Sequence, residues 1–231
     1  GGCTEKQERL FVYSGKGLKK PMEDIRVAFE HKYHIKPEII YAGCITCLNT
    51  IRQTKKGDVF ISGSVLVIKE AGALVDNHQY VALHVPVIGV HKDNPKNINT
   101  VNDLAATGVR LAIGNAKMCS MGRVAESILK KTDLKDQLIQ NIVIKTSTGV
   151  EIADLLIQKE IHAGILWQDL LVRPEYQDIR SIEIPSALNA IQEIHIAVLT
   201  ISQDKDSAQL FADFVASEGK AIFKKHGFGE K

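Results

Sequence analysis

The sequence predicts an α/β protein of two lobes, each built on a mostly parallel β-sheet flanked by helices. Apolar segments that read as strands alternate with segments of helical periodicity, which is the order of parallel strands joined by crossover helices. The length of 231 residues is sufficient for two lobes of roughly 100 residues each. A content of 45% hydrophobic and 24% charged residues is typical of a folded globular protein.

The first third of the chain reads as three strand–helix pairs. Residues 9–15, "RLFVYSG", alternate apolar and polar side chains and end at a glycine, which indicates a strand entering a loop. Residues 57–64, "GDVFISGS", are mostly apolar, as expected for a strand buried on both faces. Helical spacing of apolar residues predicts the intervening helix over 17–34. The remaining elements are a strand at 36–43, a helix that begins in 44–54 and a helix at 64–74.

The rest of the chain repeats this pattern after one long apolar segment. Residues 80–91, "YVALHVPVIGVH", read as a single buried strand, and residues 207–228 as a single amphipathic terminal helix. Strand–loop–helix repeats are predicted at 109–132 and 140–161, and further strands at 162–167 and 193–200. The predicted domains are an N-terminal segment, 1–8; lobe one, 9–84 with 198–231; lobe two, 85–197; and crossover hinge segments near 84–90 and 194–200.

Composition and charge exclude several classes of function. With 29 Lys and Arg against 27 Asp and Glu, the net charge of +2 does not favour nucleic-acid binding. No run of roughly 18 apolar residues predicts a transmembrane helix. The eight histidines are scattered and Asp169 has no evident partner, so we expect neither an enzyme nor a cofactor.

The first residues, "GGCTEKQE", suggest export. A Gly-Gly-Cys start followed by a polar stretch is typical of the region around the acceptor cysteine of a bacterial lipoprotein. Lipidation of Cys3 and a periplasmic or cell-surface location are therefore predicted. The alternative, that Cys3 is an ordinary N-terminal residue beside a tag remnant, stays open.

Five predicted strands end in loops of small or hydroxyl-bearing residues. Ligands of open α/β sheets bind beyond the carboxyl ends of strands, and helix N-termini there favour anions. Loops from both halves of the chain predict a binding cleft between the lobes. The loops are "SGKG" (14–17), "GCITC" (43–47), "SGS" (62–64), "MCSMG" (118–122) and "TSTG" (146–149).

In order and spacing, the chain from about residue 9 to 229 resembles the substrate-binding proteins of ABC importers. The resemblance is greatest to the molybdate/tungstate-binding group, which has the type II periplasmic-binding fold. It implies a monomeric extracytoplasmic protein that binds a small molecule or oxyanion and docks on a membrane permease, with no nucleic-acid partner. The residues that carry it are "LFVYSGKGL", "IIYAGCITCLNTI", "GDVFISGS", "LAIGNAKMCSMGRVAESIL", "TSTGVEIADLLIQKEIHAGILWQDLL" and "FADFVASEGKAIFKKHGFG".

The resemblance also implies a set of ligand-binding residues. In that family, hydroxyls and backbone N–H groups from these loops hold the oxyanion. Carried over by position, the set is Ser14, Gly15, Lys16, Gly17, Gly43, Cys44, Thr46, Cys47, Ser62, Ser64, Cys119, Ser120, Met121, Thr148, Gly149, Val150 and Trp167.

The chain departs from the family pattern by replacing hydroxyl donors with sulfur. Gly17 and Cys44 stand where serines are usual, and Trp167 where a tyrosine is usual. Three interpretations of the cysteines stay open. Backbone N–H groups bind the oxyanion beside a Cys44–Cys47 disulfide; Cys44, Cys47 and Cys119 bind a soft metal such as Cu(I) or Zn(II); or the thiols recognise a sulfur-containing small molecule such as glutathione.

A second class of protein shares this fold, the effector-binding domain of LysR-type transcription regulators. Those proteins carry a DNA-binding domain ahead of the effector domain, and residues 1–8 leave no room for one. The importer is therefore the preferred interpretation, and the regulator domain stays as an alternative.

Overall fold

The structure is a computed structural model that describes residues 9–231, and the chain divides into two compact units. Unit 1 comprises the described residues up to Leu83 together with Gln192–Lys231, and unit 2 comprises His84–Ile191. Residues 192–197, which the sequence placed in the second lobe, lie in unit 1 because their strand pairs with unit 1's β3. Within the described residues, no helix combines the length and the apolar character that crossing a bilayer requires.

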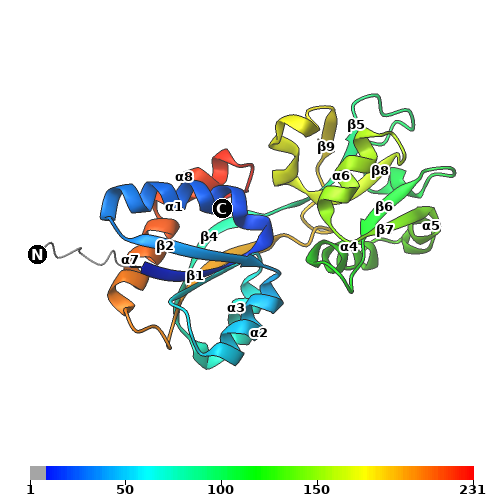
Figure 1. Cartoon of the computed structure of the whole chain (residues 1–231). Helices are drawn as coiled ribbons and strands as arrows, with labels where there is room; N and C mark the ends of the chain where they lie inside the picture. The colour runs from blue at the N-terminus through cyan, green and yellow to red at the C-terminus, as the bar shows by residue number, and fades with distance from the viewer. Residues whose placement is uncertain (1–8) are drawn as a thin grey trace, which may run out of the picture. The chain divides into compact units, whose positions relative to one another are not determined.

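Unit 1 contains a five-stranded sheet in the order β2-β1-β3-β10-β4 (Figure 1). Strand β1 pairs in parallel with β2 and with β3, whereas β10 pairs antiparallel with β3. The α/β class is therefore confirmed, with a mixed sheet. The strands are β1 (Arg9–Gly15), β2 (Lys36–Ala42), β3 (Val59–Ser62), β4 (Val75–His84) and β10 (Gln192–Leu199).

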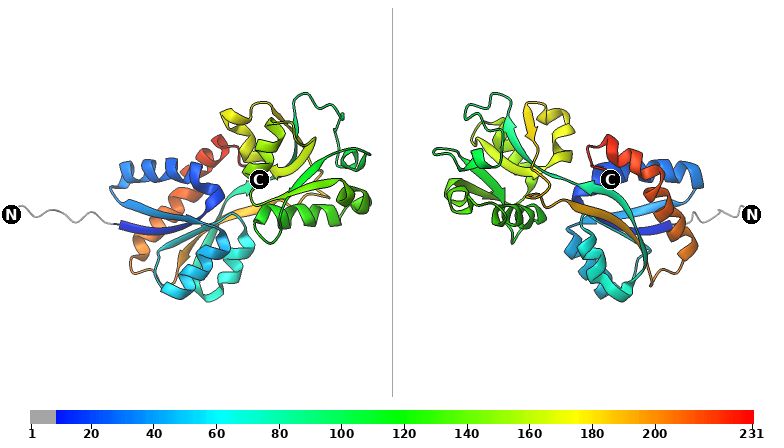
Figure 2. Two further views of the ribbon diagram at one scale, coloured as in Figure 1. Left: turned by 45° about the vertical axis from the view of Figure 1, so that its right-hand side comes forward. Right: turned by 180° about the vertical axis from the view of Figure 1, so that it is seen from behind.

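Helices cover both faces of this sheet, and each face has its own apolar core. One core gathers Phe29, Phe211 and Phe223 from the helices α1, α7 and α8, with the rings of Phe29 and Phe211 4.9 Å apart. The other core gathers side chains of α2 and α3, on the opposite face (Figure 2). The helices are α1 (Lys19–Tyr33), α2 (Cys44–Thr54), α3 (Val65–Ala71), α7 (Lys205–Ala216) and α8 (Glu218–Lys225), with short 3-10 turns η1 (Lys16–Leu18) and η2 (Gly72–Leu74).

The single terminal helix predicted over 207–228 was wrong, because the chain breaks at Ser217. The backbone of Ser217 leaves the helical region, at φ −114° and ψ −86°. Its Oγ donates to the carbonyl oxygen of Asp213 at 2.6 Å, so a side chain satisfies one of the carbonyls that the ended helix leaves free. Helix α8 then starts in a new direction.

Unit 2 contains a second mixed sheet, in the order β7-β6-β8-β5-β9. Strand β6 pairs in parallel with β7 and β8, and β5 pairs antiparallel with β8 and β9. One apolar core lies between this sheet and its helices. The strands are β5 (Pro86–His91), β6 (Leu111–Gly114), β7 (Ile142–Thr146), β8 (Ala163–Trp167) and β9 (Ile179–Ile182). The helices are η3 (Asn102–Ala105), α4 (Ser120–Lys130), α5 (Lys135–Asn141), α6 (Gly149–Ile157), η4 (Gln168–Val172) and η5 (Pro174–Tyr176).

The predicted single strand at 80–91 is two strands that belong to different sheets. Strand β4 ends at His84 and β5 begins at Pro86. Proline cannot donate to a strand ladder, and the first position of a strand is one of the few places where it is tolerated. The chain passes from unit 1 into unit 2 at this break and returns to unit 1 at Gln192.

Candidate functional site

The three predicted loops of unit 1 meet around the sulfur of Cys44. The N–H of Gly63 donates to Cys44 Sγ at 3.4 Å. A Cβ placed on Gly15 would lie only 2.8 Å from the same sulfur, so the loop after β1 passes directly beside it. Because β1, β2 and β3 are parallel neighbours, their carboxyl ends share one edge of the sheet. The structure therefore brings loops 14–17, 43–47 and 62–64 together.

Cys47 ties two of these loops together from inside. Its side chain is 1% exposed, and its thiol lies within hydrogen-bond reach of the carbonyl oxygens of Ser14, at 3.5 Å, and Ala42, at 3.7 Å. Burial, with a smaller contribution from neighbouring Cys44, raises the pKa of the Cys47 thiol to about 11. Cys47 therefore stays a neutral thiol at physiological pH and holds the ends of β1 and β2.

Thiol reactivity should separate Cys47 from the two other described cysteines. At pH 8, iodoacetamide is expected to alkylate the partly exposed Cys44 and Cys119 while leaving Cys47 unmodified, since alkylation requires an accessible thiolate. Peptide mass spectrometry of the native protein gives the rate at each site, and denatured protein is the control. Equal rates for Cys44 and Cys47 in native protein would contradict the assignment.

The same pKa shift predicts a loss of stability at alkaline pH. The native state holds the Cys47 proton up to a pH of about 11, whereas an unshifted thiol has a pKa of 9.0. The stabilisation is therefore complete below pH 9 and is lost as the pH rises from 9 to about 11. Urea denaturation of wild type and Cys47→Ala across this range measures the free energy of unfolding. The part of its decrease between pH 9 and 11 that comes from the Cys47 thiol should be missing in the variant.

The hydroxyls of the predicted serines of unit 1 are all engaged in hydrogen bonds within that unit. Ser14 Oγ is buried and donates to the carbonyl oxygen of Gly15 at 3.0 Å. Ser62 Oγ donates to Ser64 O at 2.8 Å, and Ser64 Oγ donates to Gln192 Oε1 at 3.0 Å. These hydroxyls shape the loops. The predicted site residues that the structure leaves exposed are Lys16, Gly17, Gly43, Thr46, Ser120 and Val150.

In unit 2, the end of β6 lies directly against the first turn of α4. A Cβ on Gly114 would approach Cys119 Sγ to 2.8 Å and the N–H nitrogen of Gly122 to 2.7 Å. Met121, a predicted ligand contact, is 1% exposed and belongs to the apolar core, whereas Ser120 is exposed. The loop 118–122 therefore presents Cys119, Ser120 and the helix N-terminus at its surface.

The loop that begins α6 contacts the same region of unit 2. A Cβ on Gly149 would lie 3.8 Å from Trp167 Cδ1 and 4.0 Å from Met121 Cγ. Thr148 caps the helix, its Oγ1 accepting from the N–H of Glu151 at 3.2 Å, and the Glu151 carboxylate accepts from the N–H of Ser147 at 3.0 Å. The predicted loops of unit 2 are thus brought together, with Trp167 beside them.

The helices that follow these loops differ at their N-termini. Helices α3 and α6 are capped by Ser64 and Thr148, and α6 also carries Glu151 in its first turn. Helices α2 and α4, of 11 residues each, have no side-chain cap among the described residues and no acidic residue in their first turns. The first-turn N–H groups of a helix have no intrahelical partner. Among the described helices that follow these loops, α2 and α4 therefore combine donors free of a side-chain cap with an acid-free first turn, as does α1, which begins one 3-10 turn after the first loop.

Trp167 is held by a buried pair that the sequence did not reveal. The ring of His84 stacks on Trp167, with centroids 3.6 Å apart and planes at 14°. His84 Nε2 lies 3.0 Å from Asp169 Oδ1, and both side chains are 7% exposed. The expectation that Asp169 has no partner was wrong. The two residues are far apart in sequence, on the first crossover and after β8, so no local signal connects them.

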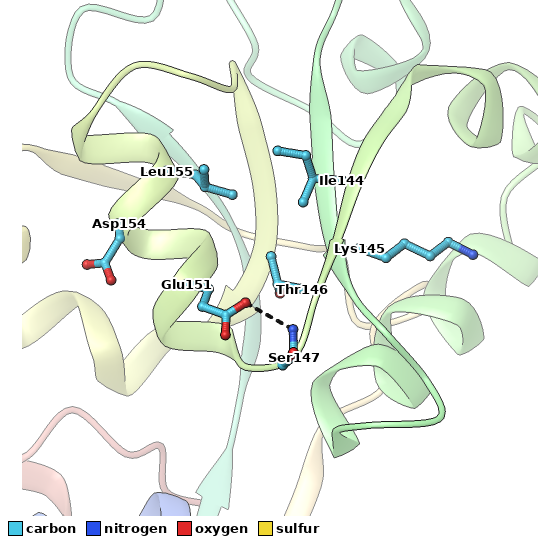
Figure 3. A pocket seen from close by; sticks show the side chains of 7 residues that line it. All are labelled: Ile144, Lys145, Thr146, Ser147, Glu151, Asp154 and Leu155. Atoms are coloured by element: carbon cyan, nitrogen blue, oxygen red, sulfur yellow. Dashed lines mark hydrogen bonds between the residues drawn. The ribbon is translucent and has the colours of Figure 1, made fainter.

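A pocket of about 350 Å³ lies beside α6 and the edge strand β7 (Figure 3). Its lining includes the carboxylates of Glu151 and Asp154, which disfavour an anion. Asp154 Oδ1 already accepts from Tyr176 Oη at 2.8 Å. The pocket adjoins the loop after β7 through Thr146 and Ser147, but it does not cover the exposed loop residues of α2 or α4. The lining residues are Ile144, Lys145, Thr146, Ser147, Glu151, Asp154 and Leu155.

The described cysteines are three free thiols, Cys44, Cys47 and Cys119. The structure thus differs from the alternative in which Cys44 and Cys47 form a disulfide. Within residues 9–231, no group of three or more His, Cys, Asp or Glu side chains is placed to hold a metal ion, so the soft-metal alternative gains no support. Cys3 lies outside the described residues.

Comparison with known proteins identifies relatives of one functional type. The sequence model of the family described as bacterial extracellular solute-binding protein matches residues 10–229. A binding protein of Haemophilus influenzae is 29% identical over 228 residues, which is 95% of this chain and 90% of that protein.

Two solved structures share the fold across both chains. The substrate-binding domain of a molybdenum ABC transporter from Clostridium difficile superposes with a TM-score of 0.83 at 21% identity, covering 96% of this chain and 99% of its own. The periplasmic molybdate-binding protein of Azotobacter vinelandii superposes with a TM-score of 0.76 at 15% identity, covering 96% and 99%. At these identities, the likeness establishes the fold.

Proposed function

Because the chain belongs to the family of bacterial extracellular solute-binding proteins, we propose that it serves an ABC importer by binding a small oxyanion of the molybdate or tungstate kind. The observation that carries the ligand proposal is the pair of helix N-termini, of α2 in unit 1 and α4 in unit 2, that have neither side-chain caps nor first-turn acids. The chain would then deliver the anion to a membrane permease. Family membership also supports the importer over the regulator domain.

The electrostatics at these two turns favour an anion. The aligned peptide dipoles of a helix place about half a positive charge at its N-terminus, and the free N–H groups donate directly to an oxyanion. Lys16 is exposed on the loop beside the start of α2, and Lys117 is exposed on the loop that leads into α4. In each unit taken by itself, an oxyanion would therefore meet backbone donors backed by one lysine.

The N-termini of the capped helices α3 and α6 are weaker candidates for binding the anion. The N–H of Glu151 in the first turn of α6 donates to Thr148 Oγ1. The Glu151 carboxylate, which accepts from the N–H of Ser147 ahead of the helix, would repel an anion. Helix α3 uses Ser64 as a cap, as α6 uses Thr148. Val150, a sequence-predicted donor, is thus a weaker candidate than the first-turn residues of α2 and α4, and Trp167 would border the site through its indole face.

A carboxylate introduced into the first turn of α2 tests the anion proposal. Thr46 is exposed in that turn, and Thr46→Glu places a negative charge where the anion would sit while favouring the helix dipole, so the fold should be retained. We expect molybdate affinity, measured by isothermal titration calorimetry, to fall at least about tenfold, the equivalent of about 1.4 kcal/mol. Asn49→Glu, exposed one residue beyond that turn on the same helix, is the matched control and should bind like wild type.

Ser120→Glu makes the same test at α4, so the contributions of the two units are measured separately. Tungstate, sulfate and phosphate complete the ligand panel, and a bound oxyanion should raise the melting temperature by mass action. No binding of any of the four oxyanions would overturn the ligand proposal and leave the family assignment intact. Equal affinity of wild type and Thr46→Glu would move the site away from α2.

A thiol-containing organic anion is a second candidate, favoured by the sulfur at both turns. Cys44 and Cys119 are partly exposed at these N-termini, beside the exposed apolar side chains of Ile45 and Met118. In exchange with glutathione disulfide, a protein thiolate would form a mixed disulfide and release one glutathione. Native mass spectrometry should then show an adduct of about 305 Da that reductant removes. Serine substitution of the cysteine that carries the adduct, Cys44 or Cys119, would abolish it. No adduct would exclude covalent capture.

Two further features stay predictions. Lipidation of Cys3 would place the protein at a membrane surface, and intact mass of protein from its native membrane would reveal the lipid. A monomeric state is expected for the binding component, and size-exclusion chromatography with light scattering tests it. A stable dimer would contradict that part of the proposal.

A further inference from the structure

Two histidines of unit 1 place the same ring nitrogen against each other on neighbouring strands. His78 lies on β4 and His195 on β10, and their Nδ1 atoms are 2.9 Å apart. His78 is exposed, whereas His195 is mostly covered, with a side chain that is 13% exposed. No part of the solute-binding function uses this pair.

The surroundings of His195 fix which of its nitrogens carries the lone pair. Its Nε2 lies 3.2 Å from Glu193 Oε1, a contact in which Nε2–H donates to the carboxylate. Nδ1 is then the acceptor of the hydrogen bond that His78 Nδ1–H donates. A carboxylate on the far nitrogen is the arrangement that orients histidine ligands in metal sites.

The positive charge nearest to this arrangement is already paired. Lys231 Nζ lies 2.7 Å from Glu193 Oε1 and 4.7 Å from the centre of the Tyr80 ring. The lysine therefore partly neutralises Glu193, whose Oε1 it shares with His195.

The two nitrogens lie at hydrogen-bond distance, and a metal ion that replaced the shared proton would occupy two adjacent coordination positions at nearly the same separation. Metal–imidazole bonds are about 2.0–2.1 Å long. Two such bonds at a right angle separate the nitrogens by about 2.9 Å, the separation observed, and right angles belong to the tetragonal and octahedral coordination that Cu²⁺ and Ni²⁺ prefer. A tetrahedral ion would need about 3.3 Å. The exposed ring of His78 can turn to admit the ion.

The fold holds both histidines on one face of the sheet. Asn77 and Gln79, which flank His78, bond to Gln209 and Asp213 of α7, so His78 points to the opposite face, the side of α2 and α3. His195 pairs in register with Ser62 of β3, which fixes its strand. Both backbones are thus held in the sheet, and only the His78 side chain must adjust.

We propose that His78 and His195 form a binding site for a divalent late-transition-metal ion, Cu²⁺ or Ni²⁺, with water in the remaining positions. Since the described residues contain no group of three or more metal-ligating side chains, the protein supplies two ligands and leaves the ion open to solvent. Glu193 is a positioning residue that holds His195 in its metal-binding form.

Nickel is the probe, because Cu²⁺ would oxidise the free thiols. The chain is freed of metal with EDTA, titrated with NiCl₂ and followed by ¹⁵N–¹H correlation spectra. Paramagnetic broadening should be centred on the amides of residues 78 and 195. His78→Gln or His195→Gln should each lower the affinity at least about tenfold, and Glu193→Gln by about tenfold through loss of orientation. Circular dichroism confirms that each variant is folded.

His31→Gln is the matched control, an exposed histidine at the end of α1 that should leave the affinity unchanged. Three results would overturn the proposal. One is an absence of broadening at residues 78 and 195. The second is broadening centred on the cysteine loops or on His31 alone. The third is full Ni²⁺ binding by the His78→Gln/His195→Gln double variant.

Discussion

Asp169→Ala is expected to lower the free energy of unfolding of unit 2 by about 3 kcal/mol. Asp169 and His84 are each 7% exposed, with Asp169 Oδ1 and His84 Nε2 3.0 Å apart. Removing the carboxylate takes this contact from the buried imidazole of His84, which stacks on Trp167. Loss of one member of a buried polar pair is among the largest single-residue effects, because the remaining group keeps its desolvation cost. Urea denaturation followed by Trp167 fluorescence measures it.

Two controls make the result specific. Asp178→Ala removes a carboxylate whose partner Lys92 lies 2.9 Å away at the surface, and it should cost less than about 1 kcal/mol. The double variant His84→Phe/Asp169→Leu replaces the pair by apolar groups of similar volume and should recover most of the loss. If Asp169→Ala and Asp178→Ala cost the same, the buried pair has no special role.

Gly122→Ala is expected to destabilise unit 2 by about 3 kcal/mol, which corresponds to a fall of about 10 °C in its melting temperature. A Cβ at this position would lie 2.4 Å from Ala116 N and 2.4 Å from Asn115 C. These are backbone atoms of the loop after β6, so no side chain can move aside. The first turn of α4 would have to lift from the sheet, and the N–H groups proposed to bind the anion would move with it.

Gly43→Ala is the matched control in unit 1. Gly43 precedes α2 as Cys119 precedes α4, and a Cβ there meets only Thr46 Oγ1, at 3.7 Å. Its φ of −55° suits any residue. The variant should melt like wild type. Differential scanning calorimetry compares the two variants, and a Gly122→Ala protein as stable as Gly43→Ala would contradict the packing argument.

The fold was predictable wherever apolar periodicity and loop chemistry agreed. The strands at 9–15 and 36–42 and the loops after β1, β3, β6 and β7 follow from alternation and from Gly and Ser at the strand ends. The family resemblance supplied the pairing of these elements, which a periodic pattern alone does not specify. The match of the family over residues 10–229 confirms it.

The elements that were missed are those set by tertiary contacts. Strand β9 is four residues long with two exposed positions, so it has no periodic signal, and its pairing with β5 defines it. The break at Ser217 lies in a sequence that is amphipathic on both sides. Helix capping, by contrast, was readable: Thr148 and Glu151 have the spacing of a capping box, and neither Gly43 nor Cys119 offers a capping hydroxyl. That difference separates the two turns proposed to bind the anion from the capped ones.

The order of strands in unit 1 has a consequence for how the chain acquires its structure during synthesis. Strand β10 lies between β3 and β4, so the sheet cannot close until the ribosome has made residues 192–199. Unit 2 is one uninterrupted stretch, His84–Ile191, and can fold as soon as it emerges. Until β10 has been made, one edge of β3 carries unpaired N–H and C=O groups. Such an exposed strand edge can pair with another chain and lead to aggregation. Unit 1 is thus the part of the molecule whose sheet keeps an unpaired edge longest while the chain is being made.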